Sequence, residues 1–334
     1  MRSLALIAAV GVACTAFAAP ATADPLQDPA LCKRDVSKVV TPGGYEPRST
    51  KVYGTDSHGN YAGTSIRPGT NTSDLILWTG GTPRVVQEVN HLLWLYMADE
   101  NSAGTVLVSG SLPAEGRSAV LTYSGGHQGA GTLTEFAAPA GYRVSGATAL
   151  NERGDVLGSG QRISDGQNVA IVWSAIASGP RVIEGSAIDL DDDGTVLMSG
   201  GQGKPGYLWR NGQITRLADE GKFTIVEGMR NGKVIGYQTE GAWPDSQALL
   251  WDTDGNVRHI DQGGTAFSIN AGGLITGERD TMVGHESVWR DTTFLGELPY
   301  PDGVTFVSEL FVAGDDDTLF SHASDAGPLR WTCA

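Results

Sequence analysis

Residues 151–158 are NERGDVLG, and residues 169–173 are VAIVW. The first stretch places Asn and Gly in a tight turn before an apolar run, and the second is a short apolar run that ends in Trp. The pattern returns as RNGKVIG at residues 230–236 and ALLW at residues 248–251. Because these runs alternate apolar and polar residues and are bounded by Gly, Asn and Asp, they predict short antiparallel strands joined by tight hairpins.

The same unit occurs seven times in the 334 residues, once in about 42. Its turn glycines are Gly59, Gly104, Gly154, Gly194, Gly232, Gly273 and, more loosely, Gly314. An aromatic residue ends the third strand of each unit: Trp78, Tyr123, Trp173, Trp209, Trp251, Trp289 and Trp331. Four strands in a repeat of this length are typical of a β-propeller blade. The sequence therefore predicts an all-β, seven-bladed β-propeller with four antiparallel strands per blade, almost without helix, whose anchor aromatics pack between blades.

We expect residues 24–334 to form a single propeller domain. Its blades are predicted at residues 50–90, 91–138, 141–184, 185–220, 222–262, 264–300 and 303–334. The seventh unit ends just after its third strand and lacks a fourth. Residues 36–40 resemble the fourth strands of other units, such as residues 85–89, so we expect the N-terminal segment 32–40 to complete the last blade and close the ring.

Two of the three cysteines, Cys32 and Cys333, lie near the ends of the predicted domain. Lone cysteines usually pair in an oxidising compartment. A disulfide between them would lock the added strand and requires the two ends to lie side by side. The alternative is a pair of free thiols.

Residues 1–23 have the features of a signal peptide. Arg2 precedes an apolar run, and Ala21–Ala23 resembles a cleavage site before Asp24. No other apolar stretch approaches the length of about 18 residues that spans a membrane, so we expect a secreted, extracellular protein without a membrane anchor. A formal net charge of −15 opposes binding to nucleic acid or anionic lipid.

Residues 268–277 are SINAGGLITG, and residues 285–289 are HESVW. Together they resemble the unit of the extracellular HAF repeats, A-x-x-I-N-x-x-G-x-V-V-G followed by a loop and H-A-F-L-W, with His285 in the His position. Residues 151–158 and 247–251 fit less closely, and the resemblance extends over about residues 50–333. It implies a secreted bacterial propeller and no established activity.

Three motifs that could bind a metal or cofactor have simpler interpretations. Asp189–Gly194 begins like a calcium loop, but Leu197 and Gly200 stand where later ligands are needed, and Asp is a common turn residue. The G-x-G-x-x-G match at residues 201–206 precedes a hairpin, whereas a dinucleotide site needs a helix there. Residues 285–286 (HE) lack the second His of a zinc motif. We therefore expect neither a metal nor a cofactor.

The variable loops between second and third strands share a face with the connections between blades, where propellers usually hold their sites. Two tryptophans outside the anchor set lie there, Trp243 in a loop and Trp94 near the start of a first strand. Aromatic rings with acids and arginines nearby suit stacking on sugars or peptide side chains. The alternative is that both tryptophans only pack against neighbours. The candidate ligand-binding residues are Arg67, His91, Trp94, Arg162, Glu240, Trp243, Asp245 and Arg279.

Because the sequence has no G-x-S-x-G or C-x-x-C motif, it favours a non-catalytic binding module. Such a module, secreted as a monomer, would recognise a carbohydrate or protein partner through the loop face. One alternative is a propeller hydrolase or lyase that acts on an extracellular polysaccharide with carboxylates at the channel mouth and His91 or His285. Another is a structural protein of the cell envelope without a ligand.

Overall fold

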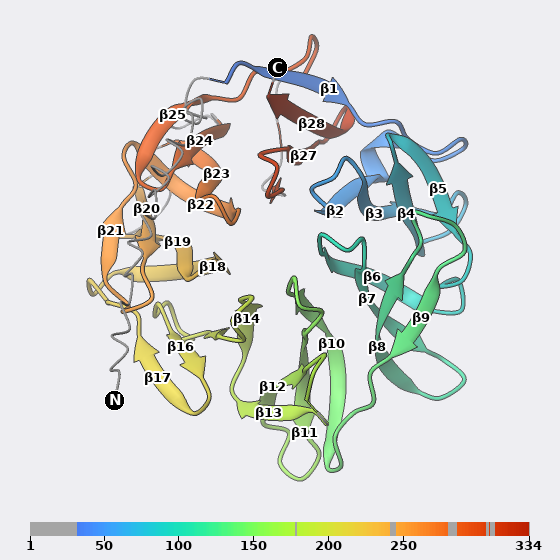
Figure 1. Ribbon diagram of the computed structural model, residues 1–334, viewed down its shortest axis with the longest axis horizontal. Helices are drawn as coiled ribbons and strands as arrows, with labels where there is room; N and C mark the ends of the chain where they lie inside the picture. Colours follow the sequence, from blue (N-terminus) through green and yellow to red (C-terminus); the bar gives the residue numbers. More distant parts are fainter. Residues whose placement is uncertain are drawn as a thin grey trace, which may run out of the picture. The chain divides into compact units, whose positions relative to one another are not determined.

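Seven four-stranded antiparallel sheets surround a central axis in the computed structural model (Figure 1). The structure describes residues 32–177, 179–240, 245–279, 286–304, 307 and 311–333. Within these residues the only helical element is a short 3-10 turn, η2 (Pro47–Ser49). The predicted all-β, seven-bladed propeller is confirmed, while the predicted signal peptide, residues 1–23, lies outside the described residues.

In each blade the four strands lie side by side in order, from the innermost first strand to the outermost fourth strand (Figure 1). The first, innermost strands are β2 (Lys51–Thr55), β6 (Leu93–Glu100), β10 (Tyr142–Leu150), β14 (Ala187–Leu190), β18 (Phe223–Arg230), β22 (Gly263–Ile269) and β26 (Val312–Ala313). The second strands are β3 (Tyr61–Ile66), β7 (Val106–Leu112), β11 (Val156–Arg162), β15 (Val196–Met198), β19 (Lys233–Thr239), β23 (Leu274–Arg279) and β27 (Leu319–Ala323). The third strands are β4 (Ser73–Thr79), β8 (Arg117–Ser124), β12 (Asn168–Trp173), β16 (Tyr207–Arg210), β20 (Ser246–Trp251), β24 (Glu286–Arg290) and β28 (Gly327–Cys333). The fourth strands are β5 (Thr82–Val86), β9 (Thr132–Glu135), β13 (Arg181–Glu184), β17 (Gln213–Arg216), β21 (Val257–His259), β25 (Thr293–Glu297) and β1 (Arg34–Lys38).

The last blade combines strands from both ends of the chain. Its sheet order is β1-β28-β27-β26, so β1 is its fourth strand. β1 pairs antiparallel with β28, and Val36 lies opposite Trp331. Cys32 and Cys333 are disulfide-bonded. The predicted closure by an N-terminal strand and the predicted disulfide are therefore confirmed.

The anchor aromatics pack between blades, as predicted. All are almost fully buried except Trp209, which is partly exposed and packs against the guanidinium of Arg181, 4.9 Å from the ring centroid. Five indoles also donate to a backbone carbonyl in the segment that leads into their blade. The pairs are Trp78 to Val40 (2.6 Å), Trp173 to Ala137 (2.9 Å), Trp251 to Ala218 (3.0 Å), Trp289 to Asp261 (2.7 Å) and Trp331 to Pro299 (2.8 Å).

We expect Trp251→Ala to lower the free energy of unfolding by about 3–5 kcal/mol, because it opens a cavity between two blades and removes the partner of the Ala218 carbonyl. Trp209→Ala is the matched control and should cost less than half as much, because that ring is already partly exposed. Urea unfolding followed by circular dichroism measures both changes. Equal losses in the two variants would contradict this account of the anchors.

The repeated Asn of the first hairpin ties neighbouring blades together. Asn151 Oδ1 accepts the amide of Asp155 at 2.8 Å and so closes its own hairpin. Its Nδ2 donates to the carbonyl of Asp191 in the next blade at 3.0 Å. The same donation to the next blade is made by Asn101 to Asn151 (3.1 Å) and by Asn270 to Gly314 (2.8 Å). The repeated Asn thus holds two blades, in addition to forming a turn.

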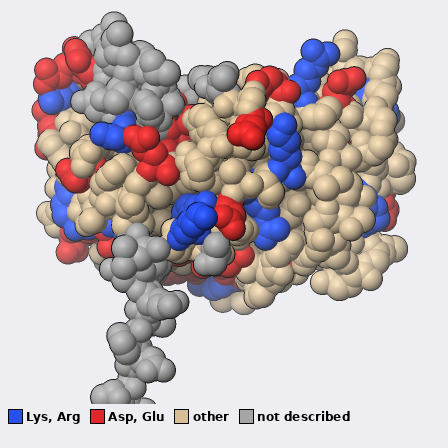
Figure 2. Space-filling model, turned by 90° about the horizontal axis from the view of Figure 1, so that it is seen from above, with Lys and Arg blue, Asp and Glu red and all other residues tan. Residues whose placement is uncertain are grey.

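Acidic and basic side chains are interspersed on the side of the molecule seen in Figure 2, without a continuous basic surface there. Within the described part of the chain, no helix has the length and apolar character needed to cross a membrane.

Candidate active site

The inner strands enclose a cavity on the axis, at the end where the hairpins between first and second strands lie. We call this end the hairpin mouth and the opposite end the loop mouth. The cavity has a volume of about 180 Å³, and residues of all seven inner strands line it. A second cavity of about 240 Å³ shares Asp99 and Asp189 with the first. Both are smaller than the roughly 300–1,000 Å³ of drug-sized ligand pockets, so each has room only for a small group or for one end of a longer ligand.

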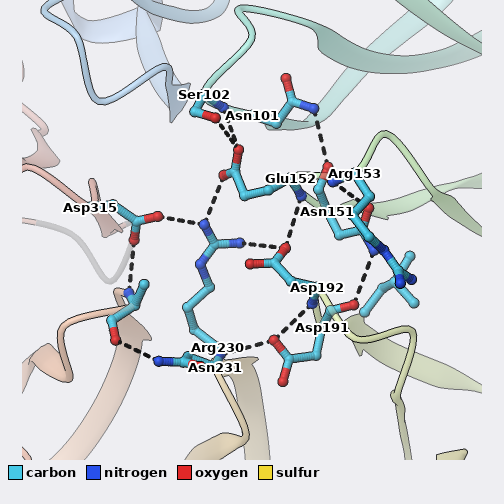
Figure 3. A network of polar contacts seen from close by, with 12 residues as sticks. Asn101, Ser102, Asn151, Glu152, Arg153, Asp191, Asp192, Arg230, Asn231 and Asp315 are labelled. Atoms are coloured by element: carbon cyan, nitrogen blue, oxygen red, sulfur yellow. Dashed lines mark hydrogen bonds and ion pairs between the residues drawn. The ribbon is translucent and has the colours of Figure 1, made fainter. Parts of the chain in front are cut away.

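Arg230 occupies the hairpin mouth (Figure 3). Its guanidinium contacts carboxylates from three other blades: Glu152 Oε1 at 2.7 Å, Asp192 Oδ1 at 3.3 Å and Asp315 Oδ2 at 2.5 Å. Burial lowers the pKa of Arg230, but the hydrogen bonds and charges of these carboxylates outweigh burial and raise it overall. Three carboxylates around one cation leave the hairpin mouth with an excess of negative charge.

Backbone amides of neighbouring hairpins hold these carboxylates in place (Figure 3). The contacts are Ser102 N to Glu152 Oε2 (2.8 Å), Glu152 N to Asp192 Oδ1 (2.9 Å) and Ala271 N to Asp315 Oδ1 (2.8 Å). The negative charge is therefore fixed by the fold before any ligand binds. Charge placed in advance in this way is the usual source of electrostatic stabilisation in active sites.

Asp99 on β6 and Asp189 on β14 lie deeper on the axis and line both cavities. Each accepts two backbone amides: Asp99 from Glu100 (2.8 Å) and Leu150 (3.1 Å), and Asp189 from Leu190 (2.7 Å) and Met229 (2.7 Å). Burial outweighs these hydrogen bonds and raises the pKa of Asp99 to about 7 and that of Asp189 to about 6. Both carboxyl groups therefore hold a proton to a higher pH than a solvated carboxyl group does, and the negative charge of Asp189 adds to the rise in the pKa of Asp99.

The fold does not need a carboxyl group at this position of the repeat. Ser268 occupies the equivalent position on β22 and lines both cavities. Its hydroxyl oxygen accepts the amide of Ala313 in the next blade at 3.1 Å, as Asp99 accepts that of Leu150 at 3.1 Å. Since serine can provide the bond between blades, the two aspartates add an acid–base capacity that the scaffold does not require.

Asp189, Asp191 and Asp193 point to different partners and do not form a calcium loop. Asp191 accepts the amides of Asn231 (2.9 Å) and Gly232 (2.6 Å) in the next blade, and Asp193 pairs with Arg210 at 3.0 Å. Among the described residues, no group of three or more His, Cys, Asp or Glu side chains is placed to hold a metal ion. The segment after residues 201–206 is the strand β16, so the dinucleotide motif has no helix either.

The charged residues predicted to bind a ligand at the loop face do not come together. Four of them form ion pairs within their own blades: Arg67 with Asp74 (2.6 Å), Arg162 with Glu184, Arg279 with Glu297 (2.6 Å) and Glu240 with Lys222 (2.7 Å). His91 is exposed and its Nδ1 lies 3.1 Å from the carbonyl of Glu88. Asp245 is exposed, and Trp94 is 72% exposed. Trp243 and His285 lie outside the described residues.

The residues at the axis escaped the sequence analysis, although one signal was present. Asp99 and Asp189 stand two residues before the polar residue of the first turn, where other units have Ala149 or Ser268. An acid at an otherwise small or apolar position of an inner strand indicates a site on the axis. Asp189 was considered only as part of a calcium motif.

No family model matches the chain, and no curated protein matches its sequence. Among solved structures, an oligogalacturonate lyase in complex with manganese is similar over 91% of this chain and 96% of its own, with 12% identity and a TM-score of 0.62. The β-propeller domain of the Trilobed protease from Pyrococcus furiosus, which has an open velcro topology, matches 76% of this chain and 86% of its own, with 13% identity and a TM-score of 0.54. A prolyl endopeptidase matches 83% of this chain but only 46% of its own, with 13% identity and a TM-score of 0.54.

At these identities the likeness shows a shared propeller fold. The similar propellers include a lyase that is matched over nearly its whole length and a domain found in peptidases. The prediction of a non-catalytic binding module is therefore contradicted, and the enzyme alternative is better supported. The physical reason for the error is that the acid–base groups come from separate blades and form no continuous sequence motif.

Proposed function

We propose that the protein is a glycoside hydrolase that acts on a neutral extracellular polysaccharide in its axial channel. The observation that carries the proposal is the pair Asp99 and Asp189, which line the same cavities with pKa values of about 7 and about 6. Glycoside hydrolysis commonly uses one protonated and one ionised carboxyl group. The whole-length likeness to a propeller lyase supports a saccharide-directed activity for this fold.

Each carboxyl group has a distinct part in the reaction. Asp99 donates its proton to the glycosidic oxygen as the bond from that oxygen to the anomeric carbon breaks. The ionised Asp189 takes a proton from the water molecule that attacks the same carbon, so that one water molecule is consumed for each bond cleaved. The two carboxyl groups then return to their starting states by exchanging protons with solvent. The backbone amides on both side chains fix their orientation.

The charge at the axis favours hydrolysis of a neutral sugar over elimination from a uronate. A uronate carboxylate would have to lie near Asp99, Asp189 and the acidic hairpin mouth, and the Arg230 guanidinium is already shared by three carboxylates. The proposal assigns the acid and base roles to Asp99 and Asp189, whose carboxyl groups line the same cavities.

Asp99→Asn and Asp189→Asn should each reduce the hydrolysis of neutral polysaccharides by about 10²–10⁴-fold, the usual contribution of a general acid or base. Release of reducing ends from xylan, mannan and β-glucan measures the activity. The wild-type pH profile should be bell-shaped, with its optimum between about 6 and 7, because Asp189 must be ionised and Asp99 protonated.

Ser268→Ala measures what this bond between blades contributes by itself, because it removes the equivalent bond at the same cavities without removing an acid. Its loss of activity should be at least about tenfold smaller than that of Asp99→Asn. Absence of hydrolysis of all three polysaccharides by the wild type at pH 6.5, or full activity of Asp99→Asn, would refute the proposal.

The disulfide fits an oxidising compartment, and we propose that the protein is secreted with residues 1–23 as its signal peptide. We also propose that the blades are degenerate HAF repeats. Residues 268–277 and 285–289 support this relation. Appearance of a mature chain that begins at Asp24 in the culture medium, identified by N-terminal sequencing, is the expected result.

A further inference from the structure

The inner strand that carries Asp99 has an exposed aromatic residue near its other end, where the strand begins. Trp94 is 72% exposed, and its neighbours Leu93 and Tyr96 are 40% and 51% exposed. Leu95, which lies between them, is buried in the core between the first two blades. The Leu95 side chain therefore packs into the core, whereas the Trp94 side chain lies at the surface.

The backbone at Trp94 is strained. The pairing of β6 with β7 shifts register between Leu93 and Tyr96, and Trp94 has a φ of +54°. This left-handed conformation is disfavoured for any residue with a Cβ atom and especially for a bulky one. The seven other non-glycine residues with positive φ in the described part of the chain are all Ser, Gln, Asn or Asp. Glycine would adopt this backbone conformation without strain. A tryptophan at such a position indicates a role outside folding.

Two aromatic side chains extend from Tyr96, two residues after Trp94, to the axial cavity. The rings of Tyr96 and Tyr53 meet edge to face, with centroids 6.0 Å apart, and Tyr53 lines the cavity at the hairpin mouth. Trp94 lies five positions before Asp99 on β6, a distance of about 16 Å along a strand. Arg230 and its carboxylates occupy the hairpin mouth, whereas Trp94 lies near the opposite end of β6, toward the loop mouth.

We propose that Trp94 and Tyr96 form a subsite at the loop mouth that stacks on a sugar ring of a neutral polysaccharide whose end enters the cavity. An exposed, flat indole matches the flat C–H face of a pyranose, because the electron-rich face of an aromatic ring attracts such hydrogens. An apolar peptide side chain is instead usually held in an enclosed pocket. The proposal rests on the hydrolase function for the identity of the substrate, and the subsite requires a substrate long enough to span the distance from Asp99.

Trp94→Gly tests the subsite, because it removes the ring and relaxes the backbone. We expect the midpoint of thermal unfolding to rise, while binding of long oligosaccharides becomes about five- to tenfold weaker, the usual range for losing one ring contact. Calorimetric titration with xylo-, manno- and cello-oligosaccharides of two to six units, in the Asp99→Asn background, measures binding without turnover. Dimers should bind equally well with and without Trp94.

Gln202→Gly is the matched control, because Gln202 is exposed and also has a positive φ, of +50°. It should stabilise the fold without changing any binding constant. Unchanged binding of hexamers by Trp94→Gly, or a loss that extends equally to dimers, would overturn the subsite. A loss seen only with apolar peptides would also overturn it and would assign the platform to a peptide. The hydrolase proposal fails separately, if Asp99→Asn keeps its activity, and that outcome does not alter the binding measurement.

Discussion

Removing the disulfide by Cys32→Ser is expected to lower the free energy of unfolding by about 5–6 kcal/mol. The bond between Cys32 and Cys333 closes a loop of 301 residues (333 − 32). The chain-entropy model assigns about that value to a loop of this length, because the open chain regains its freedom on unfolding. Packing alone holds β1 weakly, since its five residues are half-buried or exposed and it pairs only with β28.

Urea unfolding of the double variant Cys32→Ser/Cys333→Ser measures this loss without leaving a free thiol at either position. Wild-type protein in dithiothreitol should lose the same amount, and the double variant should not respond to dithiothreitol. If the wild type and the double variant unfold within about 1 kcal/mol of each other, the closure depends on β1 packing and not on the covalent bond.

Lowering the pH from 7.5 to 5 is expected to stabilise the fold by about 3–4 kcal/mol through Asp99 and Asp189. Both carboxyl groups bind a proton more tightly in the folded chain, where their pKa values are about 7 and about 6, than in the unfolded chain, where both are near 3.8. Their contribution is therefore fully present below about pH 4 and is lost as the pH rises through about 6 and then 7.

Other titrating groups also change the free energy of unfolding with pH, each in a direction set by its pKa shift. Burial also raises the pKa of Glu286, to about 7, and that of Glu100, so both groups act in the same sense. Burial lowers the pKa of His322, which therefore opposes the trend as the pH falls. Asp155 and Asp193 have lowered pKa values, and their stabilisation is lost only at more acidic pH. Stability should therefore reach its maximum near pH 5.

Asp99→Ser separates the contribution of Asp99 to the pH dependence of stability from that of the other titrating groups. Serine fits at this position, because Ser268 occupies the equivalent position on β22. The variant should lose more than half of the gain between pH 7.5 and 5 that the two aspartates provide. Denaturant unfolding at intervals of half a pH unit gives the slope of the free energy of unfolding against pH. An identical slope in the wild type and in Asp99→Ser would show that Asp99 does not bind its proton more tightly in the folded chain.

The fold could be predicted from the sequence because each blade repeats its own local signals. The anchor Trp251 and the turn residue Asn151 act within one blade and its neighbour, and their spacing is visible in any two units. The closure was predictable for the same reason, since one missing strand and one spare strand are both sequence features.

The site could not be predicted in this way because its residues meet only when the ring is complete. Glu152, Arg230 and Asp315 lie in the third, fifth and seventh blades, and no local pattern connects them. The partners of the charged loop residues could not be predicted from the sequence either. Arg67 and Arg279 form ion pairs with acids of their own blades, and the role of these residues in binding a ligand stays a prediction.

The pairing of β1 with β28 also has a consequence for the order of events in the cell. Lys38 and its partner Leu329 are 291 positions apart (329 − 38), so at about 5–20 residues per second β1 waits roughly 15–60 s for the ribosome to supply its neighbour. During that time its exposed edge could pair with another chain, and Arg34, Asp35 and Lys38 provide the charges that discourage such pairing. Folding is thus expected to end with one late step, in which the strand synthesised first, β1, pairs with the strand synthesised last, β28.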